Sequence, residues 1–212
     1  LFNTLNAASQ LAMIEGADKS SDFIENIAHL FRYNLRNMDE LVPLRDEIQY
    51  VKNYMQILKT RFGSRIEFYE DIDEAAVDIM LPRIIVQPIV ENAFIHGLQN
   101  LERNGEIHLS VKRQEAYIVV AVKDNGMGMD LDCIESILKF DEDSSIQKKH
   151  VTGIGISNVI HRLQLLFNIE DARELISIES EVGCGTEVTL RIPIGSTAVN
   201  KGLEVYDEAA NC

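Results

Sequence analysis

The chain has 212 residues, which is room for one large or two small domains at roughly 100 to 200 residues per domain. Hydrophobic residues make up 46% of it, so it can bury a core. Thirty-four acidic against twenty basic residues give a formal net charge of −14. This charge argues against partners that bind clustered Lys and Arg, namely nucleic acid and an anionic membrane surface. The sequence contains no apolar run near the roughly 20 residues of a membrane span.

The first 63 residues have a helical pattern of apolar residues throughout. We expect one helix that ends near Gly16 and a second that is capped by Ser20 or Ser21. Their apolar residues recur at helical spacing, at Leu1, Leu5, Ala8 and Ala12 and then at Ile24, Ile27, Phe31 and Leu35. One copy of such a hairpin cannot cover its apolar faces. We therefore expect a homodimer through the N-terminal helices, in which two hairpins form a four-helix bundle.

A third helix is expected to begin after Pro43. Its charges match the helix dipole, with acidic residues in the first turn and basic residues in the last: Asp46, Glu47, Lys59 and Arg61. Gly63 breaks the pattern, and strands and glycine-rich turns follow it. The sequence therefore predicts that residues 1–63 form a helical dimerisation region, with its connecting helix, and that a second domain begins at residue 64.

Beyond residue 63 the pattern predicts strands interleaved with two long helices. In chain order the expected elements are a strand at 65–70, a helix at 82–98, strands at 106–112 and 117–123, a helix at 155–167, and strands at 174–180 and 186–192. Short turns between strands favour antiparallel pairs, and the long helices need a sheet face to lie on. We therefore predict an α+β chain whose second domain, residues 64–194, is a two-layer α/β sandwich, followed by a loosely ordered tail at 195–212.

Three polar residues gather on the helix predicted at 82–98. Glu91 and Asn92 lie in its middle, and His96 follows Asn92 by one helical turn and so shares its face. A solvated helix side explains them equally well. In a functional interpretation, Glu91 and the Asn92 carbonyl could supply the oxygen ligands that a hard cation bridging phosphates prefers.

A single acidic residue, Asp124, ends the strand predicted at 117–123, and Gly126 and Gly128 follow it. An Asp-Asn-Gly sequence is most often only a tight turn. Here it follows a continuous apolar run, so the carboxylate is expected at a sheet edge beside flexible backbone. It could accept a hydrogen bond from the exocyclic amine of adenine, while the glycines let a ligand approach the main chain.

Two further glycine pairs lie later in the chain. Gly153 and Gly155 open the helix predicted at 155–167, where free backbone N–H groups suit a phosphate. Gly183 and Gly185 precede Thr186 at the hairpin that enters the last strand. Each pair alone is weak support, since the first fits a helix cap and the second a plain β-turn. A mononucleotide-binding interpretation therefore depends on all these elements together.

In this order the elements resemble the N, G1, G2 and G3 boxes of the GHKL ATP-binding superfamily. The segments QPIVENAFIHG and LFNTLN are similar, more narrowly, to those of sensor histidine kinases of the LytS type, and the resemblance runs from Leu1 to about Pro193. It implies ATP and Mg2+ as cofactors, and a phosphotransfer role for the helical dimerisation region at 1–63. It also implies that the phospho-accepting histidine lies upstream of Leu1, so that this fragment would not autophosphorylate at the family site. The fragment would be the cytoplasmic portion of a membrane-anchored bacterial sensor, with membrane contact only through upstream segments.

The resemblance assigns five residues to the phosphate end of the nucleotide. Asn92 would bind the magnesium ion, and Glu91 and His96 would complete the N box around the phosphates. Gly153 and Gly155 would seat the phosphates.

At the adenine end the resemblance assigns five more residues. Asp124 would hold the adenine amino group, in a pocket shaped by Gly126 and Gly128. Gly185 with Thr186 would close that side. The stretch 130–152 corresponds to the lid over ATP, which we expect nucleotide to order.

From this resemblance we expect an ATP-dependent protein histidine kinase of a two-component system, which passes the γ-phosphate to a histidine and onward to the receiver domain of a response regulator. One alternative is a GHKL ATP hydrolase that drives a clamp. In such proteins a Glu four residues before the N-box Asn activates water, and Pro88 occupies that position here. The other alternative is a non-catalytic dimerisation module with a decayed pocket, which Ile95 leaves open because the family often has a Lys there.

Overall fold

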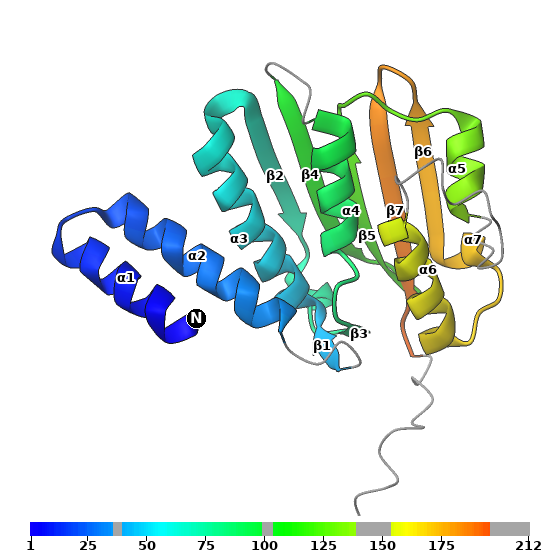
Figure 1. The fold of residues 1–212 in the computed structure, drawn as a ribbon. Coiled ribbons are helices and arrows are strands. Elements are labelled where there is room, and N and C mark those ends of the chain that lie inside the picture. Colours follow the sequence, from blue (N-terminus) through cyan, green and yellow to red (C-terminus); the bar gives the residue numbers. More distant parts are fainter. Residues whose placement is uncertain (36–39, 99–103, 139–153, 196–212) are drawn as a thin grey trace, which may run out of the picture.

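The computed structural model describes residues 1–35, 40–98, 104–138 and 154–195 (Figure 1). The helices are α1 (Phe2–Ile14), α2 (Asp18–Asn34), α3 (Leu44–Phe62), α4 (Gln87–Asn92), α5 (Leu131–Leu138), α6 (Ile154–Phe167) and α7 (Ala172–Leu175). A π-helix, η3 (Ala93–Leu98), continues α4, and two 3-10 turns are η1 (Gly63–Arg65) and η2 (Glu74–Ala76). The strands are β1 (Leu41–Pro43), β2 (Ile66–Ile72), β3 (Met80–Pro82), β4 (Gly105–Arg113), β5 (Tyr117–Asp124), β6 (Ile176–Glu181) and β7 (Gly185–Pro193).

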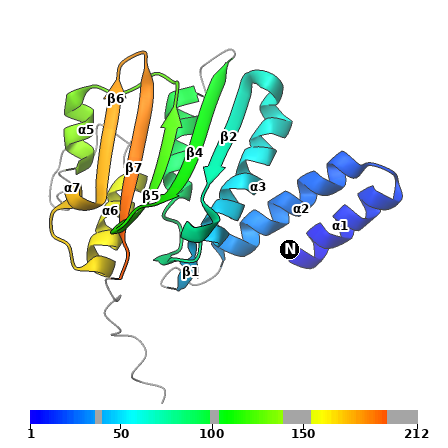
Figure 2. The same ribbon diagram turned by 180° about the vertical axis from the view of Figure 1, so that it is seen from behind.

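Five of the strands form one mixed sheet in the order β2-β4-β5-β7-β6, and β1 pairs with β3 in a small separate sheet. Helices α3, α4, α5 and α6 lie on one face of the large sheet, and Figure 2 shows the opposite face without a helix over it in the described part of the chain. The predicted α+β architecture, with a helical N-terminal region and a two-layer sandwich, is confirmed.

The strand pairing follows the length of the connections. Short turns join antiparallel neighbours, as predicted, but β2 and β4 run parallel. The chain between them passes through β3, α4 and η3, which is long enough for a crossover. The expectation of antiparallel pairs applied to strands joined by short turns and made no prediction for this pair.

One core joins the helical layer to the sheet. Alternation along β5 buries Ile118, Val120 and Val122, and β7 buries its register partners Ile192, Leu190 and Val188 on the same face. The same core includes apolar residues of α3, namely Leu44, Ile48, Val51, Met55 and Leu58. Residue 63 thus marks the change from helices to strands along the chain. Helix α3, which precedes it, nevertheless shares the core of the sheet.

Helices α1 and α2 form an antiparallel hairpin beside this sandwich. α2 packs along α3, and α1 lies on the far side of α2 from the sheet (Figure 1). α2 begins at Asp18, so the predicted caps at Ser20 and Ser21 are wrong. Ser21 lies inside the helix and is buried between the two helices, where its hydroxyl hydrogen-bonds that of Ser9 at 2.9 Å instead of capping. Among the described residues, no helix has the length and apolar character needed to cross a membrane.

The strand predicted at 174–180 begins later than expected. Glu174 and Leu175 belong to the short helix α7, and β6 starts at Ile176. The cause is local, because the Asp171 side chain accepts a hydrogen bond from the backbone N–H of Arg173 at 2.9 Å and caps the helix.

Two leucines of α6 test the position of the core. Leu163 is fully buried, whereas Leu165 is 70% exposed. Leu163→Ala should lower the free energy of unfolding by about 3 kcal/mol, because it removes buried methylene groups and leaves a cavity. The matched change Leu165→Ala should alter it by less than about 0.5 kcal/mol. Urea unfolding followed by circular dichroism measures both, and equal losses would contradict the assigned face of α6.

Candidate functional site

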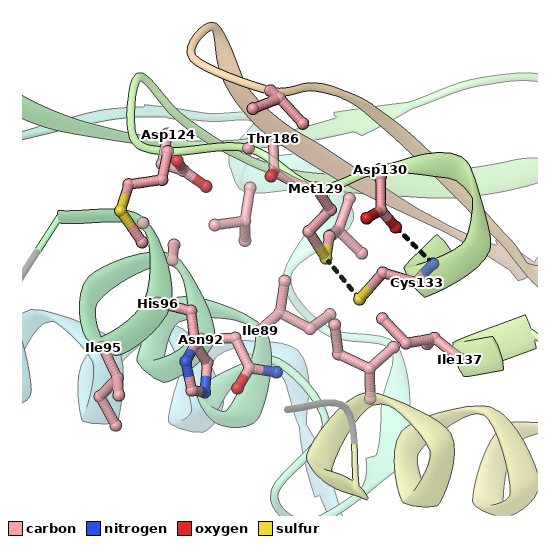
Figure 3. Close-up of a pocket in the computed structure, with 18 of the residues that line it drawn as sticks. Ile89, Asn92, Ile95, His96, Asp124, Met129, Asp130, Cys133, Ile137 and Thr186 are labelled. Atoms are coloured by element: carbon pink, nitrogen blue, oxygen red, sulfur yellow. Dashed lines mark hydrogen bonds between the residues drawn. The ribbon is translucent and has the colours of Figure 1, made fainter. Parts of the chain in front are cut away.

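A cavity of about 680 Å³ opens between α4, η3, α5 and the ends of β5 and β7 (Figure 3). Its volume is within the range of about 300 to 1,000 Å³ that is usual for small-molecule sites. Polar groups reach it from Asn92, His96, Asp124 and Thr186. An apolar wall surrounds them, formed by residues that include Ile89, Val122, Met129, Ile137, Ile156 and Val188.

Asp124 lies in this cavity because of the alternation of β5. It is the next inward position after Val122, and its register partners are Thr186 on β7 and Ile107 on β4. The residue is only 5% exposed. Burial raises the pKa of the Asp124 carboxyl, while hydrogen bonds from the backbone N–H groups of Gly126 and Thr186 act in the opposite direction. The distance from Gly126 N to Asp124 Oδ1 is 2.8 Å.

Glycines let several backbone segments meet around this carboxylate. A Cβ atom on Gly97 would lie 2.6 Å from Asp124 Oδ1, and one on Gly126 would lie 2.3 Å from the carbonyl oxygen of Gly97. A Cβ atom on Gly185, whose φ is +97°, would lie 2.1 Å from the carbonyl oxygen of Asp124. These contacts leave no room for a side chain. Gly128 lines the cavity, whereas Gly126 and Gly185 support the turn from outside it.

Gly97 was not among the predicted site residues. Its sequence signal is its position directly after His96, at the end of the segment QPIVENAFIHG. The reason for a glycine there becomes visible only when η3 is packed against β5, because the contact is with a residue far away in sequence.

The helix that carries Asn92 and His96 differs from the predicted helix at 82–98. α4 starts only at Gln87, the preceding residues are not helical, and Ile84 has a φ of +61°. After Asn92 the chain continues as the π-helix η3. π-helical turns are frequent at functional sites.

Asn92 and His96 nevertheless point into the same cavity (Figure 3). The Nδ2 atom of Asn92 is buried and has no hydrogen-bond partner among the described residues, whereas His96 is exposed. A buried, unpaired amide group is costly unless a ligand or water satisfies it. Asn92 is therefore a strong candidate for ligand contact.

Glu91 does not join this group of side chains. It projects toward Gln87, whose Nε2 donates to its carboxylate at 2.8 Å. Burial, aided by the negative charge of Glu91, raises the pKa of Tyr50 on α3 to about 12, which places Glu91 on the α3 side of α4. Its suggested role as a cation ligand stays a prediction that this position does not favour.

Gly155, at the start of α6, lies next to the Asn92 end of the cavity. A Cβ atom there would be 3.2 Å from Pro88 Cβ and 3.8 Å from Asn92 Nδ2. The other glycine of the pair, Gly153, lies outside the described residues. So does most of the stretch predicted to form a lid, although its first part forms α5, which places Ile137 in the cavity wall.

The Thr186 side of the cavity is fixed by a hydroxyl that the sequence analysis did not identify. Ser180 on β6 accepts a hydrogen bond from the backbone N–H of Met129 at 2.8 Å, and its hydroxyl also lies 2.9 Å from that of Thr186. This contact joins the turn after Asp124 to the last two strands.

Comparison with known proteins agrees with this geometry. The sandwich, with its cavity between the helical layer and the ends of β5 and β7, is of the GHKL ATPase type. Residues 77–196 match the family described as histidine kinase-, DNA gyrase B-, and HSP90-like ATPase, and residues 1–66 match the histidine kinase family. Since the first match covers more than half of the chain, the chain belongs to the family of histidine kinase-, DNA gyrase B- and HSP90-like ATPases.

Several similar proteins are named as sensor histidine kinases or as LytS sensor proteins. Sensor histidine kinase YpdA of Escherichia coli (strain K12) is 32% identical over 94% of this chain and 33% of its own length. Sensor protein LytS of Bacillus anthracis is 30% identical over 91% of this chain and 32% of its own length. The chain thus spans about a third of the length of these relatives.

A solved structure supports the fold. Full-length ShkA in complex with AMPPNP aligns with a TM-score of 0.51 and 18% identity, over 88% of this chain and 39% of that one.

The raised pKa of Asp124 makes a prediction about stability. The favourable contribution of this group is fully present below its ordinary pKa of 3.8 and is lost as the pH rises through the higher pKa of the folded state. The variant Asp124→Asn has no ionisable side chain at this position, so its stability lacks this pH dependence. The free energy of unfolding of the variant minus that of the wild type should therefore increase from about pH 4 to pH 8. Urea unfolding at a series of pH values measures it, and a flat or falling difference would contradict the burial effect.

Proposed function

We propose that this chain is the kinase part of an ATP-dependent sensor histidine kinase of a two-component system. The observation that carries the proposal is that one cavity collects a buried carboxylate, Asp124, and an unpaired amide, Asn92, from distant elements. The family and the names of the relatives support the same function.

We place adenine at the Asp124 side. The carboxylate would accept a hydrogen bond from the exocyclic amine, and the apolar wall would cover the faces of the purine. Thr186 and Gly128 would border this part of the pocket. The close glycine contacts would hold Asp124 in place before the ligand arrives, so that little ordering accompanies binding.

We place the phosphates at the Asn92 side. The residues there fit a magnesium ion shared with a nucleotide, because Mg2+ commonly takes one or two protein oxygens and completes its shell with phosphate oxygens and water. Asn92 would supply such an oxygen, and bound Mg2+ would neutralise phosphate charge. His96 would donate to a phosphate oxygen from the mouth of the cavity, and the backbone of Gly155 would approach the phosphates closely. Positioning of this kind is the main contribution of a protein to phosphoryl transfer.

The acceptor in this proposal is a histidine upstream of Leu1, so the fragment alone would not be phosphorylated at that site. A neutral imidazole, with an ordinary pKa of about 6.5, is a competent nucleophile near neutral pH. The phosphoryl group would then pass to the receiver domain of a response regulator.

We further propose that the hairpin dimerises and that the chain is the cytoplasmic portion of a membrane-anchored sensor. Several large apolar side chains of the hairpin are exposed in one copy, among them Leu1, Leu11, Met13, Ile14 and Leu35. A second hairpin would cover such residues in a four-helix bundle. The relatives named as sensor proteins support the location.

The function is tested first at Asp124. Asp124→Asn should abolish measurable ATP binding in calorimetry, because an amide can no longer act as a charged acceptor for the adenine amine. Unchanged ATP affinity in a folded variant would refute the adenine assignment.

The reaction is tested with radiolabelled ATP on the longer protein that includes the residues before Leu1. Labelled protein supports the kinase. Release of phosphate without labelled protein would support an ATP-hydrolysing clamp instead, although Pro88 stands where such proteins have a catalytic Glu. Neither product would point to a non-catalytic dimerisation module.

A further prediction concerns Gly97. Gly97→Ala places a methyl group 2.6 Å from Asp124 Oδ1, so the carboxylate must move and ATP affinity should fall by at least about tenfold. Gly63→Ala is the control, because nothing lies near its Cβ position and its φ of +63° makes it costly only for stability. Calorimetry should therefore show weakened ATP binding for the first variant alone, and equal affinities of the two variants would contradict the role of this contact.

A further inference from the structure

The loop before α4 receives polar contacts from three other helices. It consists of residues 83–86, which lie between β3 and the helix that carries Asn92. Tyr33 of α2, Glu47 of α3 and Arg162 of α6 all contact it. The loop is therefore a point where the hairpin, the sandwich and the proposed phosphate side meet.

Glu47 is the centre of this contact. It is fully buried. Its carboxylate oxygens accept hydrogen bonds from the backbone N–H groups of Ile84, Ile85 and Val86, with N···O distances of 2.7, 2.8 and 3.0 Å. Ile84 has a φ of +61°, which is costly for a β-branched residue. The three hydrogen bonds compensate for that conformation and fix where α4 begins.

Tyr33 links the same carboxylate to the hairpin. Its hydroxyl donates to Glu47 Oε1, and its ring lies under the guanidinium group of Arg83, 3.8 Å from Cζ to the ring centroid. Arg83 in turn donates from Nη2 to the Tyr33 carbonyl. Burial and the charge of Glu47 both raise the pKa of Tyr33, so its hydroxyl remains a donor at neutral pH.

The loop is equally tied to the cavity. Pro88, two residues after it, packs against Gly155 at the start of α6, and Arg162 of α6 donates to the carbonyl of Arg83. Asn92 follows within the same short helix. A shift of the loop would therefore move Asn92 relative to Gly155.

We propose that Glu47 is a positioning residue for the proposed kinase reaction, and that the hydrogen bond it accepts from Tyr33 couples the position of the α1–α2 hairpin to the position of Asn92. This inference rests on the proposed function. The carboxylate also stabilises the fold, because without it three buried backbone N–H groups would have no acceptor. The hydroxyl of Tyr33 adds a contact from another helix at the same point, which an acceptor for the loop alone would not need.

Tyr33→Phe gives the sharpest test. It deletes one donor and keeps the ring under Arg83. Hydrogen exchange is measured with and without a non-hydrolysable ATP analogue and Mg2+. In the wild type the analogue should slow exchange both at residues 84–92 and in the last turn of α2, because coupling between two sites is reciprocal. In the variant the response of α2 should be lost, and analogue affinity should fall by about threefold to tenfold, as expected for one hydrogen bond.

Tyr69→Phe is the matched control. Tyr69 is an exposed tyrosine of β2 that stacks on His108, away from the loop. It should leave exchange and affinity as in the wild type. Glu47→Gln, which turns one acceptor oxygen into a donor, should speed exchange at 84–86 more than Tyr33→Phe does. If Glu47→Gln does not fold, Tyr33→Phe decides alone.

The coupling is overturned if the analogue binds the wild type without changing exchange in α2, or if the α2 response persists in Tyr33→Phe. A merely structural role for the contact predicts one of these two results. A wild type that binds no nucleotide would instead overturn the proposed function. In that case the coupling would still be decided by basal exchange at 89–92, away from the contact itself, which should be faster in Tyr33→Phe than in Tyr69→Phe if the link reaches Asn92 and equal if it does not.

Discussion

The whole site depends on one constraint, which is that a charged residue occupies an inward position of a central strand. Asp124 continues the buried row of Ile118, Val120 and Val122, at the point where the cavity separates the sheet from the helical layer. A carboxylate is tolerated there because backbone N–H groups of Gly126 and Thr186 bind it and because the cavity begins beside it. The end of the apolar core is thus also the beginning of the pocket.

The glycines around Asp124 serve this same constraint. Gly97 and Gly126 let η3 approach Asp124 and its turn, and Gly185 lets the start of β7 approach the backbone of Asp124. Side chains at these positions would push η3 and β7 away from β5 and would open the pocket floor. A pattern that suggests chain flexibility in the sequence therefore corresponds to close and rigid packing in the fold.

Much of the fold could be predicted because local patterns and tertiary packing agree along β4, β5 and β7. The parallel pairing of β2 with β4 could not, since pairing direction is set by a crossover that periodicity does not reveal. For the site, residue types and order placed Asn92, His96, Asp124 and Thr186 in one group, and these residues line one cavity, while their roles stay predictions. The side of the helix on which Glu91 lies could not be predicted, because a single helix offers two polar sides and only packing against α3 decides which side faces the cavity.

Asp46 and Glu47 illustrate where such reasoning ends. Both are acidic residues in the first turn of α3, and the helix dipole favours either of them equally. In the fold Asp46 is partly exposed, while Glu47 is fully buried and binds three backbone N–H groups of a loop far away in sequence. The acidic residues correctly marked the first turn of α3. They could not show which of the two only stabilises α3 and which also fixes the start of α4. That difference arises from the left-handed conformation of Ile84, which leaves consecutive N–H groups pointing at one place where an acceptor is required.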